Sequence, residues 1–435
     1  MSIKKSIRTL FLTGYKPYPP IGGSPLRNWQ NINIMMKLGP VAVFSVSNSP
    51  DEVKDNTKHP PGVELWNHYN LSNIPIQRSF LQKIEWWLSP RKHYLTDSLY
   101  TDSVSRELDQ ILREFKPDLV IFAEPYRYCY LPIVKSRGCG IILDEHNVEA
   151  PLFRENQPPV AGIKSKLILS LLFNKMKSIE HDFIRQADQV WMCSDNDAYL
   201  LRTLYGKFQN VRVVPNAIDV AHYDGVRIGK CPPPGKLEQV PWTLFFAGTF
   251  TYTPNEVAAK LLIDQIFPRL QQVYPNCRLI LAGKFPTPHM LEAAKQNPRI
   301  VVTGLVEDIR PYMSISSVVI TPLLQGGGTR LKILEAFAAG CPVVSTAKGA
   351  EGLRVRDGKH LLIRDSIDEL VAGVCELWAD PYRRQTLAQN AYELVKSEYS
   401  WESVCKRVEQ SVQELLYDGE TSDTPLTPPP HSLPI

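Results

Sequence analysis

The chain has 435 residues, of which 43% are hydrophobic and 22% are charged, and its formal net charge is +4. This length and composition indicate a globular protein of more than one domain, because a single core rarely grows beyond about 250–300 residues. No apolar run approaches the roughly 18 residues that a membrane span requires, and the small net charge gives no support to nucleic-acid binding. The eight cysteines are scattered singly, which favours a reducing, cytoplasmic compartment over a disulfide framework or a zinc site.

Strand and helix patterns alternate along the first half of the chain. They predict strands at residues 7–15, 41–46, 118–123, 140–144, 189–193 and 211–214, and helices at 28–38, 101–115 and 165–186. The first strand follows a basic N-terminus, but its apolar run is short and ends at Lys16, so a secretory signal is not expected. Such alternation predicts a parallel sheet covered by helices on both faces.

The second half repeats this alternation. Strands are predicted at 243–247, 278–282, 300–303, 317–321 and 342–344, with a helix from Asn255 and a last long helix at 401–417. The fold class is therefore α/β, with two Rossmann-like, doubly wound domains. The proline-rich run at 231–235 places the boundary between residues 215 and 241. The tail at 418–435 is rich in Pro, Ser and Thr and is expected to be disordered.

The segment at 318–346 carries the strongest functional signal. It predicts a strand, a loop with three glycines at 326–328, a helix from near Thr329 to Gly340, and another strand. A glycine loop that leads into a helix presents free backbone N–H groups and the positive end of the helix dipole. This arrangement suits a phosphate group.

Three charged side chains at the start of that helix extend the prediction. Arg330 and Lys332 add positive charge, and Glu335 is placed to accept two hydrogen bonds from the hydroxyls of a ribose. The segment is therefore predicted to bind a ribose diphosphate. The alternative is that Arg330 and Lys332 are solvated surface charges and that Glu335 is a carboxylate stabilised by the helix dipole.

Several motifs together resemble one family. The run GGGTRLKILEAFAAG at 326–340, followed by GAEGL at 349–353, is similar to retaining glycosyltransferases of family four, in a triple-glycine subgroup. The stretches YPPIGGS at 18–24, DEHNVE at 144–149, VPNAID at 214–219 and FAGT at 246–249 agree with it. The resemblance implies the GT-B fold, with two Rossmann-like domains facing across a cleft. It assigns residues 1–215 and a returning helix at 401–417 to the first domain, and 216–400 to the nucleotide-sugar domain.

The resemblance also implies an activity. The chain would move a sugar from a UDP-, GDP- or other nucleotide-linked donor to a glycan, a lipid-linked or a small-molecule acceptor, with retention and without a metal or cofactor. Polysaccharide or glycoconjugate biosynthesis would be its setting. The catalytic residues would be His146 and Glu335. The donor would bind at Gly22, Gly23, Gly248, Gly327, Gly328, Arg330, Leu331, Lys332 and Glu335.

Two departures from the family pattern leave an alternative open. Gly327 stands where many members have a second glutamate, and Thr249–Asn255 stands where many have an Arg and a Lys. The alternative function is therefore a non-catalytic relative that binds nucleotide sugars or acts as a scaffold. A sugar-nucleotide epimerase is disfavoured by the triple-glycine motif, and a dehydrogenase by the lack of a Gly-x-Gly-x-x-Gly run after a strand.

The chemistry around His146 also has alternatives. The histidine is expected over the transferring sugar, but a loop histidine bonded to backbone has the same sequence pattern. Asp144 and Glu145 beside it admit a general-acid role, although the family's leaving phosphate is thought to accept the acceptor proton. The run EPYRY at 124–128 suits either acceptor binding or a helix cap with core tyrosines.

Two segments carry aromatic or apolar side chains beside basic ones. One holds Trp86 and Trp87, followed by Arg91, Lys92 and His93. The other has lysines at 164, 166, 175 and 177 around an apolar run at 167–173. An amphipathic basic helix binds the surface of a membrane, so peripheral membrane association is one interpretation, and a helix packed on the sheet is the other.

Overall fold

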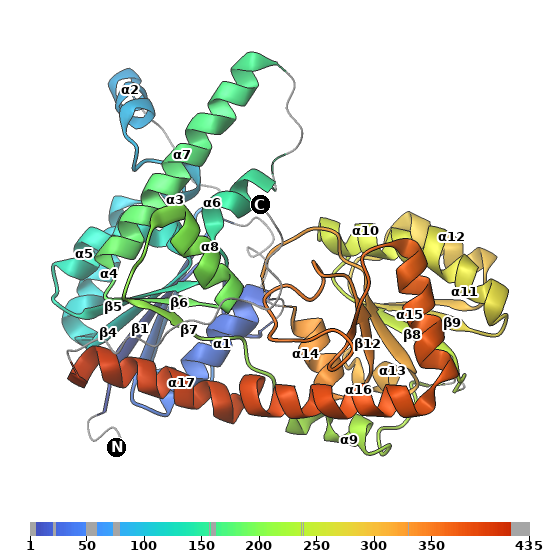
Figure 1. Cartoon of the computed structure of the whole chain (residues 1–435). Coiled ribbons are helices and arrows are strands. Elements are labelled where there is room, and N and C mark those ends of the chain that lie inside the picture. Colours follow the sequence, from blue (N-terminus) through green and yellow to red (C-terminus); the bar gives the residue numbers. More distant parts are fainter. Residues whose placement is uncertain are drawn as a thin grey trace. The chain divides into compact units, whose positions relative to one another are not determined.

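The computed structural model describes residues 6–20, 23–48, 59–72, 79–155, 157, 162–235, 237, 239–328 and 330–418. This part of the chain divides into two compact units. The N-terminal unit consists of the residues up to Pro215 together with the end of the last helix from Cys405, and the C-terminal unit consists of Asn216–Val404. Figure 1 gives the element labels used below.

The N-terminal unit is built on a seven-stranded parallel sheet in the order β3-β2-β1-β4-β5-β6-β7. Its strands are β1 (Thr9–Thr13), β2 (Val41–Ser47), β3 (Leu65–Asn70), β4 (Leu119–Ala123), β5 (Gly140–Glu145), β6 (Gln189–Met192) and β7 (Val211–Val213). Leu12 pairs with Phe44 on one side and Phe122 on the other. The order reverses between β1 and β4, and in such sheets ligands bind where the strand order reverses, beyond the carboxyl ends of the strands.

The helices of this unit cover the sheet or project from one end of it. They are α1 (Gly23–Met36), α2 (Phe80–Leu88), α3 (Tyr94–Asp97), α4 (Asp102–Phe115), η2 (Pro125–Tyr130), α5 (Leu131–Lys135), α6 (Glu149–Glu155), α7 (Ile163–Gln186) and α8 (Asp195–Tyr205). The predicted helix at 28–38 begins five residues earlier. The edge strand β3, with the sequence LWNHYN, was not predicted, because its mixed polar pattern is typical of a half-buried edge.

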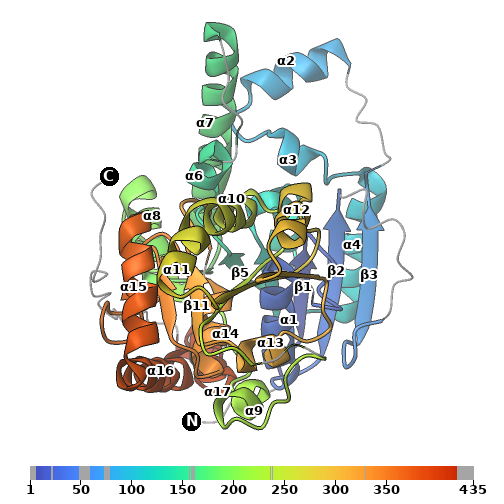
Figure 2. The same ribbon diagram turned by 90° about the vertical axis from the view of Figure 1, so that its right-hand side faces the viewer.

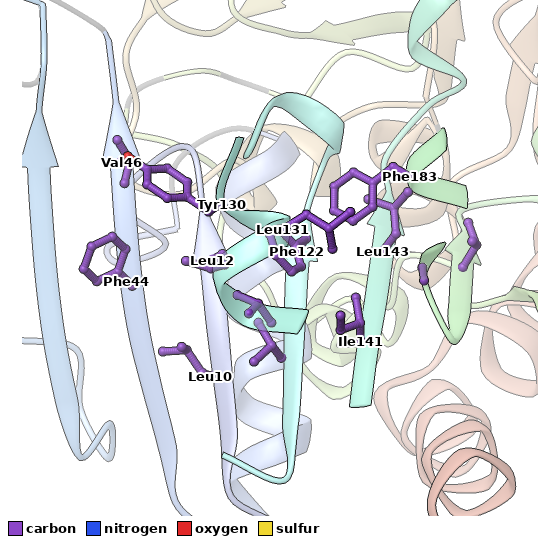
Figure 3. Close-up of a cluster of buried hydrophobic side chains, with 14 of the residues drawn as sticks. Leu10, Leu12, Phe44, Val46, Phe122, Tyr130, Leu131, Ile141, Leu143 and Phe183 are labelled. Carbon is purple, nitrogen blue, oxygen red and sulfur yellow. The ribbon is translucent and has the colours of Figure 1, made fainter. Parts of the chain in front are cut away.

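The core of this unit lies between the sheet and the helices on one of its faces. Figure 3 shows Leu10, Leu12, Phe44, Phe122 and Leu143 from four strands beside Tyr130, Leu131 and Phe183 from the helical segments. The central strands β1, β2, β4, β5 and β6 are buried on both faces, which explains why they read as continuous apolar runs.

The last helix, α17 (Trp401–Gln413), ends in a π-helical turn, η6 (Glu414–Asp418). The part of it that belongs to the N-terminal unit is bonded to β6, since Trp191 Nε1 donates to Ser411 Oγ at 2.9 Å. Gln189 Nε2 also donates to the carbonyl oxygen of Ser411 at 2.8 Å. The expected disordered tail lies outside the described residues, except for Asp418.

The C-terminal unit has a six-stranded parallel sheet in the order β10-β9-β8-β11-β12-β13. Its strands are β8 (Thr243–Ala247), β9 (Arg278–Ala282), β10 (Ile300–Gly304), β11 (Val318–Thr321), β12 (Val343–Ser345) and β13 (Leu362–Ile363). Its two faces carry separate apolar clusters, because Leu244 and Phe246 face one side and Phe245 the other. Two parallel α/β sheets were predicted, and this prediction is confirmed.

The helices of this unit are η3 (Ala221–Tyr223), α9 (Asp224–Arg227), α10 (Thr253–Leu261), η4 (Leu262–Ile266), α11 (Phe267–Val273), α12 (Pro288–Gln296), α13 (Arg310–Ser314), α14 (Leu331–Ala338), α15 (Ile367–Ala379), α16 (Pro381–Leu394) and η5 (Val395–Tyr399). Helix α14 starts later than predicted, because Arg330 has φ −82° and ψ 79° and serves as its non-helical N-cap. The predicted first residue, Thr329, lies outside the described residues.

Candidate functional site

Three glycine positions meet at the carboxyl ends of β9, β8 and β11, which are neighbours in the sheet. Gly248 follows β8 and Gly283 follows β9; a Cβ on Gly283, which has φ 146°, would lie 1.8 Å from the carbonyl oxygen of Gly248. Gly326 follows β11 with φ 100°, and a Cβ there would lie 2.6 Å from the hydroxyl of Tyr252. Only glycine permits such close approach of the backbones at Gly248 and Gly283, and Gly326 leaves room for the side chain of Tyr252. We call these three positions, with Gly327 and Gly328, the glycine cradle.

The cradle lies where the strand order of this sheet reverses, between β8 and β11. This is the position at which open α/β sheets bind ligands. Gly283 and Tyr252 were missed by the sequence analysis, although a glycine directly after a predicted strand is a usable signal. A hollow of about 780 Å³ in the same unit is lined partly by Pro241, Ser317 and Pro342, which precede the strands, so it lies at the opposite end of the sheet.

Arg330 makes contacts within the glycine loop that the sequence did not predict. Its side chain is 6% exposed, and its guanidinium donates to the carbonyl oxygens of Gly326 and Gly327, both at 2.6 Å. The guanidinium therefore braces the glycine loop. The sequence could not predict these contacts, because the direction of the side chain depends on the loop conformation.

Lys332 supplies the cation beside the cradle. Its Nζ donates to Asn255 Oδ1 at 2.7 Å and lies 4.4 Å from the centre of the Phe246 ring. Burial, together with the charge of Arg330, lowers the pKa of Lys332 to about 7. Asn255 is held in turn by the carbonyl oxygen of Thr249, to which it donates at 2.9 Å. Asn255 thus positions Lys332, and it belongs to the segment 249–255 that stands where many family members carry an Arg and a Lys.

Glu335 lies on the second turn of α14. Its Oε1 accepts a hydrogen bond from the hydroxyl of Tyr223 at 3.1 Å. Burial raises the pKa of Glu335 to about 7, against the opposing effects of Tyr223 and Lys332. A carboxylate has about four acceptor positions, so this bond leaves capacity for a ligand. Tyr223 was not predicted, because it is distant in sequence and its role depends on the fold.

In the N-terminal unit, His146 lies just beyond β5 between two carboxylates. Its Nδ1 is 3.1 Å from Glu124 Oε1, and its Nε2 is 3.6 Å from Asp144 Oδ2. Burial alone would lower the pKa of His146, but Glu124 and Asp144 together raise it to about 9. His146 is therefore an imidazolium at neutral pH, and the alternative of a loop histidine bonded to backbone is not supported.

Glu124 belongs to the run at 124–128 whose role was left open. It has φ 67°, which is unusual for a residue with a side chain. Arg127 Nη1 donates to Glu124 Oε2 at 3.2 Å and Ser24 Oγ to Oε1 at 3.1 Å. A Cβ on Gly14, after β1, would lie 1.3 Å from the Arg127 guanidinium. Gly14 was missed by the sequence analysis, and it makes room for this buried polar cluster at the switch point between β1 and β4.

Asp144 does not act as a free acid. Arg27 Nε donates to its Oδ1 at 3.0 Å and Asn31 Nδ2 to its Oδ2 at 2.8 Å. Although burial acts to raise it, Arg27 and His146 hold the pKa of Asp144 down at about 2. The alternative general-acid role is therefore wrong for Asp144, which is an ionised partner of Arg27.

Glu145 belongs to a separate buried group of acids with Glu149 and Glu180. Neither carboxylate oxygen of Glu145 has a hydrogen-bond partner among the described residues. Burial and the neighbouring acids raise the pKa of Glu145 well above its usual range, and that of Glu149 to about 8. Glu180 accepts from the backbone N–H groups of Glu149 and Ala150 at 2.6 and 3.0 Å. In this buried group of acids, the charged forms of the carboxyl groups are therefore disfavoured.

The upward pKa shifts of His146 and Glu149 predict a loss of stability at alkaline pH. The pKa of His146 is about 9 in the folded chain against 6.5 unperturbed, so its stabilisation is complete below pH 6.5 and is lost towards pH 9. The pKa of Glu149 is about 8 in the folded chain against 4.5 unperturbed, so the folded state loses stability as the pH rises from 4.5 to 8. We expect the free energy of unfolding to fall by roughly 1–2 kcal/mol per pH unit between pH 6.5 and 8. Urea titrations would measure it, and Glu149→Gln should make the dependence shallower; stability that rises across this range would contradict the assignment.

Two glycines of the N-terminal unit, Gly22 and Gly23, were predicted to approach the donor phosphates. Gly22 lies outside the described residues. Gly23 is the first residue of α1, and a Cβ added there would have no atom within 4 Å. Among the described residues, no three His, Cys, Asp or Glu side chains are grouped as metal ligands.

Two family models match the chain, each mainly within one unit. The model described as "Glycosyltransferase Family 4" matches residues 58–222, which include His146. The model described as "Glycosyl transferases group 1" matches residues 241–380, which include the glycine cradle, Lys332 and Glu335. Both units therefore match models of glycosyltransferases, in agreement with the family predicted from the sequence.

One similar protein is also a glycosyltransferase. A lipopolysaccharide 1,2-N-acetylglucosaminetransferase of Salmonella typhimurium is 30% identical over 169 residues, which cover 35% of this chain and 44% of that enzyme. The chain thus matches less than half of the length of this relative.

Solved structures share the fold. Sucrose-phosphate synthase from Thermosynechococcus elongatus superposes with a TM-score of 0.69 at 17% identity, covering 94% of this chain and 100% of that one. HepE from Anabaena, in complex with UDP, gives 0.63 at 12% identity with the same coverages. The GT-B fold class predicted from the sequence is confirmed.

Proposed function

We propose that the chain transfers a sugar from a nucleoside diphosphate to an acceptor hydroxyl, with retention of anomeric configuration and without a metal ion or other cofactor. The observation that carries the proposal is the convergence of the glycine cradle, Lys332 and Glu335 at the switch point of one sheet. A cradle of backbone groups and a helix N-terminus suit a diphosphate, and a carboxylate one turn along the same helix suits the attached ribose.

Each part of the site has a role in departure of the nucleoside diphosphate. Charge develops on the phosphate oxygens as the glycosidic bond breaks, and the N–H groups at Leu331 and Lys332 with the ammonium group of Lys332 would stabilise it. Preorganised donors of this kind contribute about 3–4 kcal/mol each. Glu335 would hold the ribose, with Tyr223 fixing the carboxylate. His146, as an imidazolium, would act on the transferring sugar, and the departing phosphate would accept the acceptor proton.

Donor and acceptor are proposed as classes. UDP-sugars are the first donors to test, because the HepE structure contains UDP; GDP-sugars are the second. The Salmonella relative is named for action on lipopolysaccharide, which favours a glycan or lipid-linked acceptor in glycoconjugate synthesis over a small molecule. The cytoplasm is proposed as the location, because all eight cysteines are free thiols.

Release of free nucleoside diphosphate decides between the transferase and its alternative. A transferase releases it at a rate that rises when acceptor is added, and NMR of the product reports the anomeric configuration. The scaffold alternative is considered because Gly327 stands where many family members have a glutamate. Such a protein would bind nucleotide sugar and release no nucleoside diphosphate. A panel of nucleotide sugars in thermal unfolding would first identify the donor, since a ligand at 100 times its Kd stabilises by about 2.7 kcal/mol.

Replacing Glu335 tests the ribose assignment. Glu335→Gln retains the size of the side chain and the bond from Tyr223, but removes the charged acceptor. We expect the Kd for nucleoside diphosphate to rise by roughly 10–100-fold, because a charge-assisted hydrogen bond contributes about 1.5–3 kcal/mol. Calorimetric titration would measure it, with Glu292→Gln on the exposed face of α12 as the matched control. Equal affinities for the two variants would refute the assignment.

Chelation tests the proposal that the reaction requires no metal ion. Lys332 and the backbone groups of the cradle are proposed to neutralise the diphosphate, so turnover should be unchanged in EDTA. The measurement is the initial rate with and without chelator at equal ionic strength. Activity that disappears in EDTA and returns with magnesium or manganese would show that the cradle is insufficient.

A further inference from the structure

Two helices of the N-terminal unit present large apolar side chains to solvent. On α2, Phe80 and Leu88 are 76% and 78% exposed, with Leu81, Ile84 and Trp87 also exposed; on α7, Ile163 is 80% exposed and Leu167 and Leu171 are 60% and 50% exposed. Figures 1 and 2 both show α2 and the first half of α7 projecting together from one end of the sheet of this unit. We call α2 and the first turns of α7, through Leu171, the projecting pair.

The two helices are fixed to one another by a buried lysine. Lys175 Nζ donates to the carbonyl oxygens of Trp86 and Ser89 at 2.5 and 2.6 Å, and lies 4.7 Å from the centre of the Trp86 ring. Lys175 and Trp86 therefore hold the base of the pair, and the sequence-based interpretation of both as surface-binding residues is wrong. Their burial leaves the neighbouring Trp87 and Leu88 outside.

The apolar side chains of the pair alternate with positive charge. Lys83 on α2 and Lys164 and Lys166 on α7 are exposed, and none of them forms an ion pair with a described residue. Glu85, the acid of α2, is already paired with Lys92 at 2.7 Å. An apolar surface with unneutralised cations among its side chains matches an anionic lipid surface, where apolar groups enter the acyl boundary and lysines meet the headgroups.

Charge also argues against a second copy of this chain as the occupant. Two copies that met through the projecting pair would bring their like-charged lysines together, which is unfavourable. No helix of the described chain is long and apolar enough to cross a membrane, so a contact through this pair would be interfacial.

We propose that the projecting pair docks the N-terminal unit on the surface of an anionic bilayer. The apolar side chains of α2 and α7 insert at the level of the headgroups, and Lys83, Lys164 and Lys166 contact anionic lipid. The inference goes beyond the transferase activity and does not depend on it, because docking is measured without donor or acceptor.

Vesicle binding of the full-length chain tests the proposal. We expect sedimentation with vesicles of phosphatidylcholine and phosphatidylglycerol, weak binding to phosphatidylcholine alone, and weaker binding at high salt. The variant Lys83→Gln/Lys164→Gln/Lys166→Gln should bind anionic vesicles on the order of 100-fold less tightly, since each lysine near such a surface contributes about fivefold. The variant Leu81→Ser/Leu88→Ser/Leu167→Ser should also lose binding.

Matched controls separate docking from folding and from the proposed function. Val273→Ser/Leu291→Ser/Leu305→Ser removes exposed apolar side chains of the C-terminal unit and should bind vesicles like the wild type. All variants should retain the circular dichroism spectrum and the nucleoside diphosphate affinity of the wild type. Equal vesicle affinity of the variants on the projecting pair and the control variant of the C-terminal unit would overturn the proposal. Wild-type protein that stays in the supernatant would also overturn it. A dimer in solution that dissociates in Leu81→Ser/Leu88→Ser/Leu167→Ser would do the same.

Discussion

Replacing Arg27 with methionine is expected to lower the free energy of unfolding of the N-terminal unit by about 3–5 kcal/mol, because it leaves Asp144 buried and charged without its partner. Arg27 is 2% exposed and Asp144 1% exposed. Besides Asp144, Arg27 Nη1 donates to the carbonyl oxygen of Val214 at 2.9 Å. The same guanidinium thus joins α1, the end of β5 and the segment after β7.

This effect would be measured by urea denaturation of the full chain, in the transition assigned to the N-terminal unit. Arg113→Met is the matched control, since Arg113 forms an exposed pair with Asp109 four residues earlier on α4. Such pairs contribute about 0.3–0.5 kcal/mol. A double variant Arg27→Met/Asp144→Asn should recover part of the loss, because the uncompensated charge is gone. Similar losses for Arg27→Met and Arg113→Met would show that Asp144 is solvated and that the buried pair has been misjudged.

The second large effect is expected at His146. We expect His146→Ala to lower turnover on the order of 10²–10³-fold, as is typical when one preorganised donor is removed, while the Kd for nucleoside diphosphate changes less than about twofold. The reason is that the diphosphate site lies on residues of the C-terminal unit, whereas His146 is proposed to act on the transferring sugar. An interaction made mainly in the transition state appears in turnover and not in binding.

Steady-state kinetics beside calorimetric binding of the diphosphate would measure both quantities for the same variant. His289→Ala, on an exposed histidine of the C-terminal unit paired with Asp264, is the control and should leave both unchanged. Glu124→Gln should weaken the imidazolium, since Glu124 raises the pKa of His146, and should therefore move the alkaline limb of the pH–rate profile to lower pH. Turnover of His146→Ala near that of the wild type would return His146 to a purely structural role, and weakened diphosphate binding would place it beside the phosphates.

The local chemistry of the donor site was accessible from the sequence because it is encoded in adjacent positions. A glycine loop between a β-branched run and a helical pattern specifies backbone that approaches a ligand, and Glu335 follows from the period of the helix. Neighbours from distant parts of the chain were not accessible. Asn255 and Gly283 reach the site because β8, β9 and β11 are adjacent in the sheet, an order that no local pattern encodes. Tyr223 reaches it because η3 packs against α14.

The sequence alone determined two parallel α/β sheets, the triple-glycine loop after β11 and the resemblance to glycosyltransferases, since alternating periods and contiguous motifs follow from covalent order. The tertiary structure decided what each polar side chain does. Arg330 turned into the loop, Lys175 was buried beneath α2, and Asp144 was neutralised by Arg27. The physical reason is that a charged side chain in low dielectric requires a partner, and whether its nearest partner is a carbonyl, a carboxylate or a ligand depends on which segments the fold brings within hydrogen-bond reach.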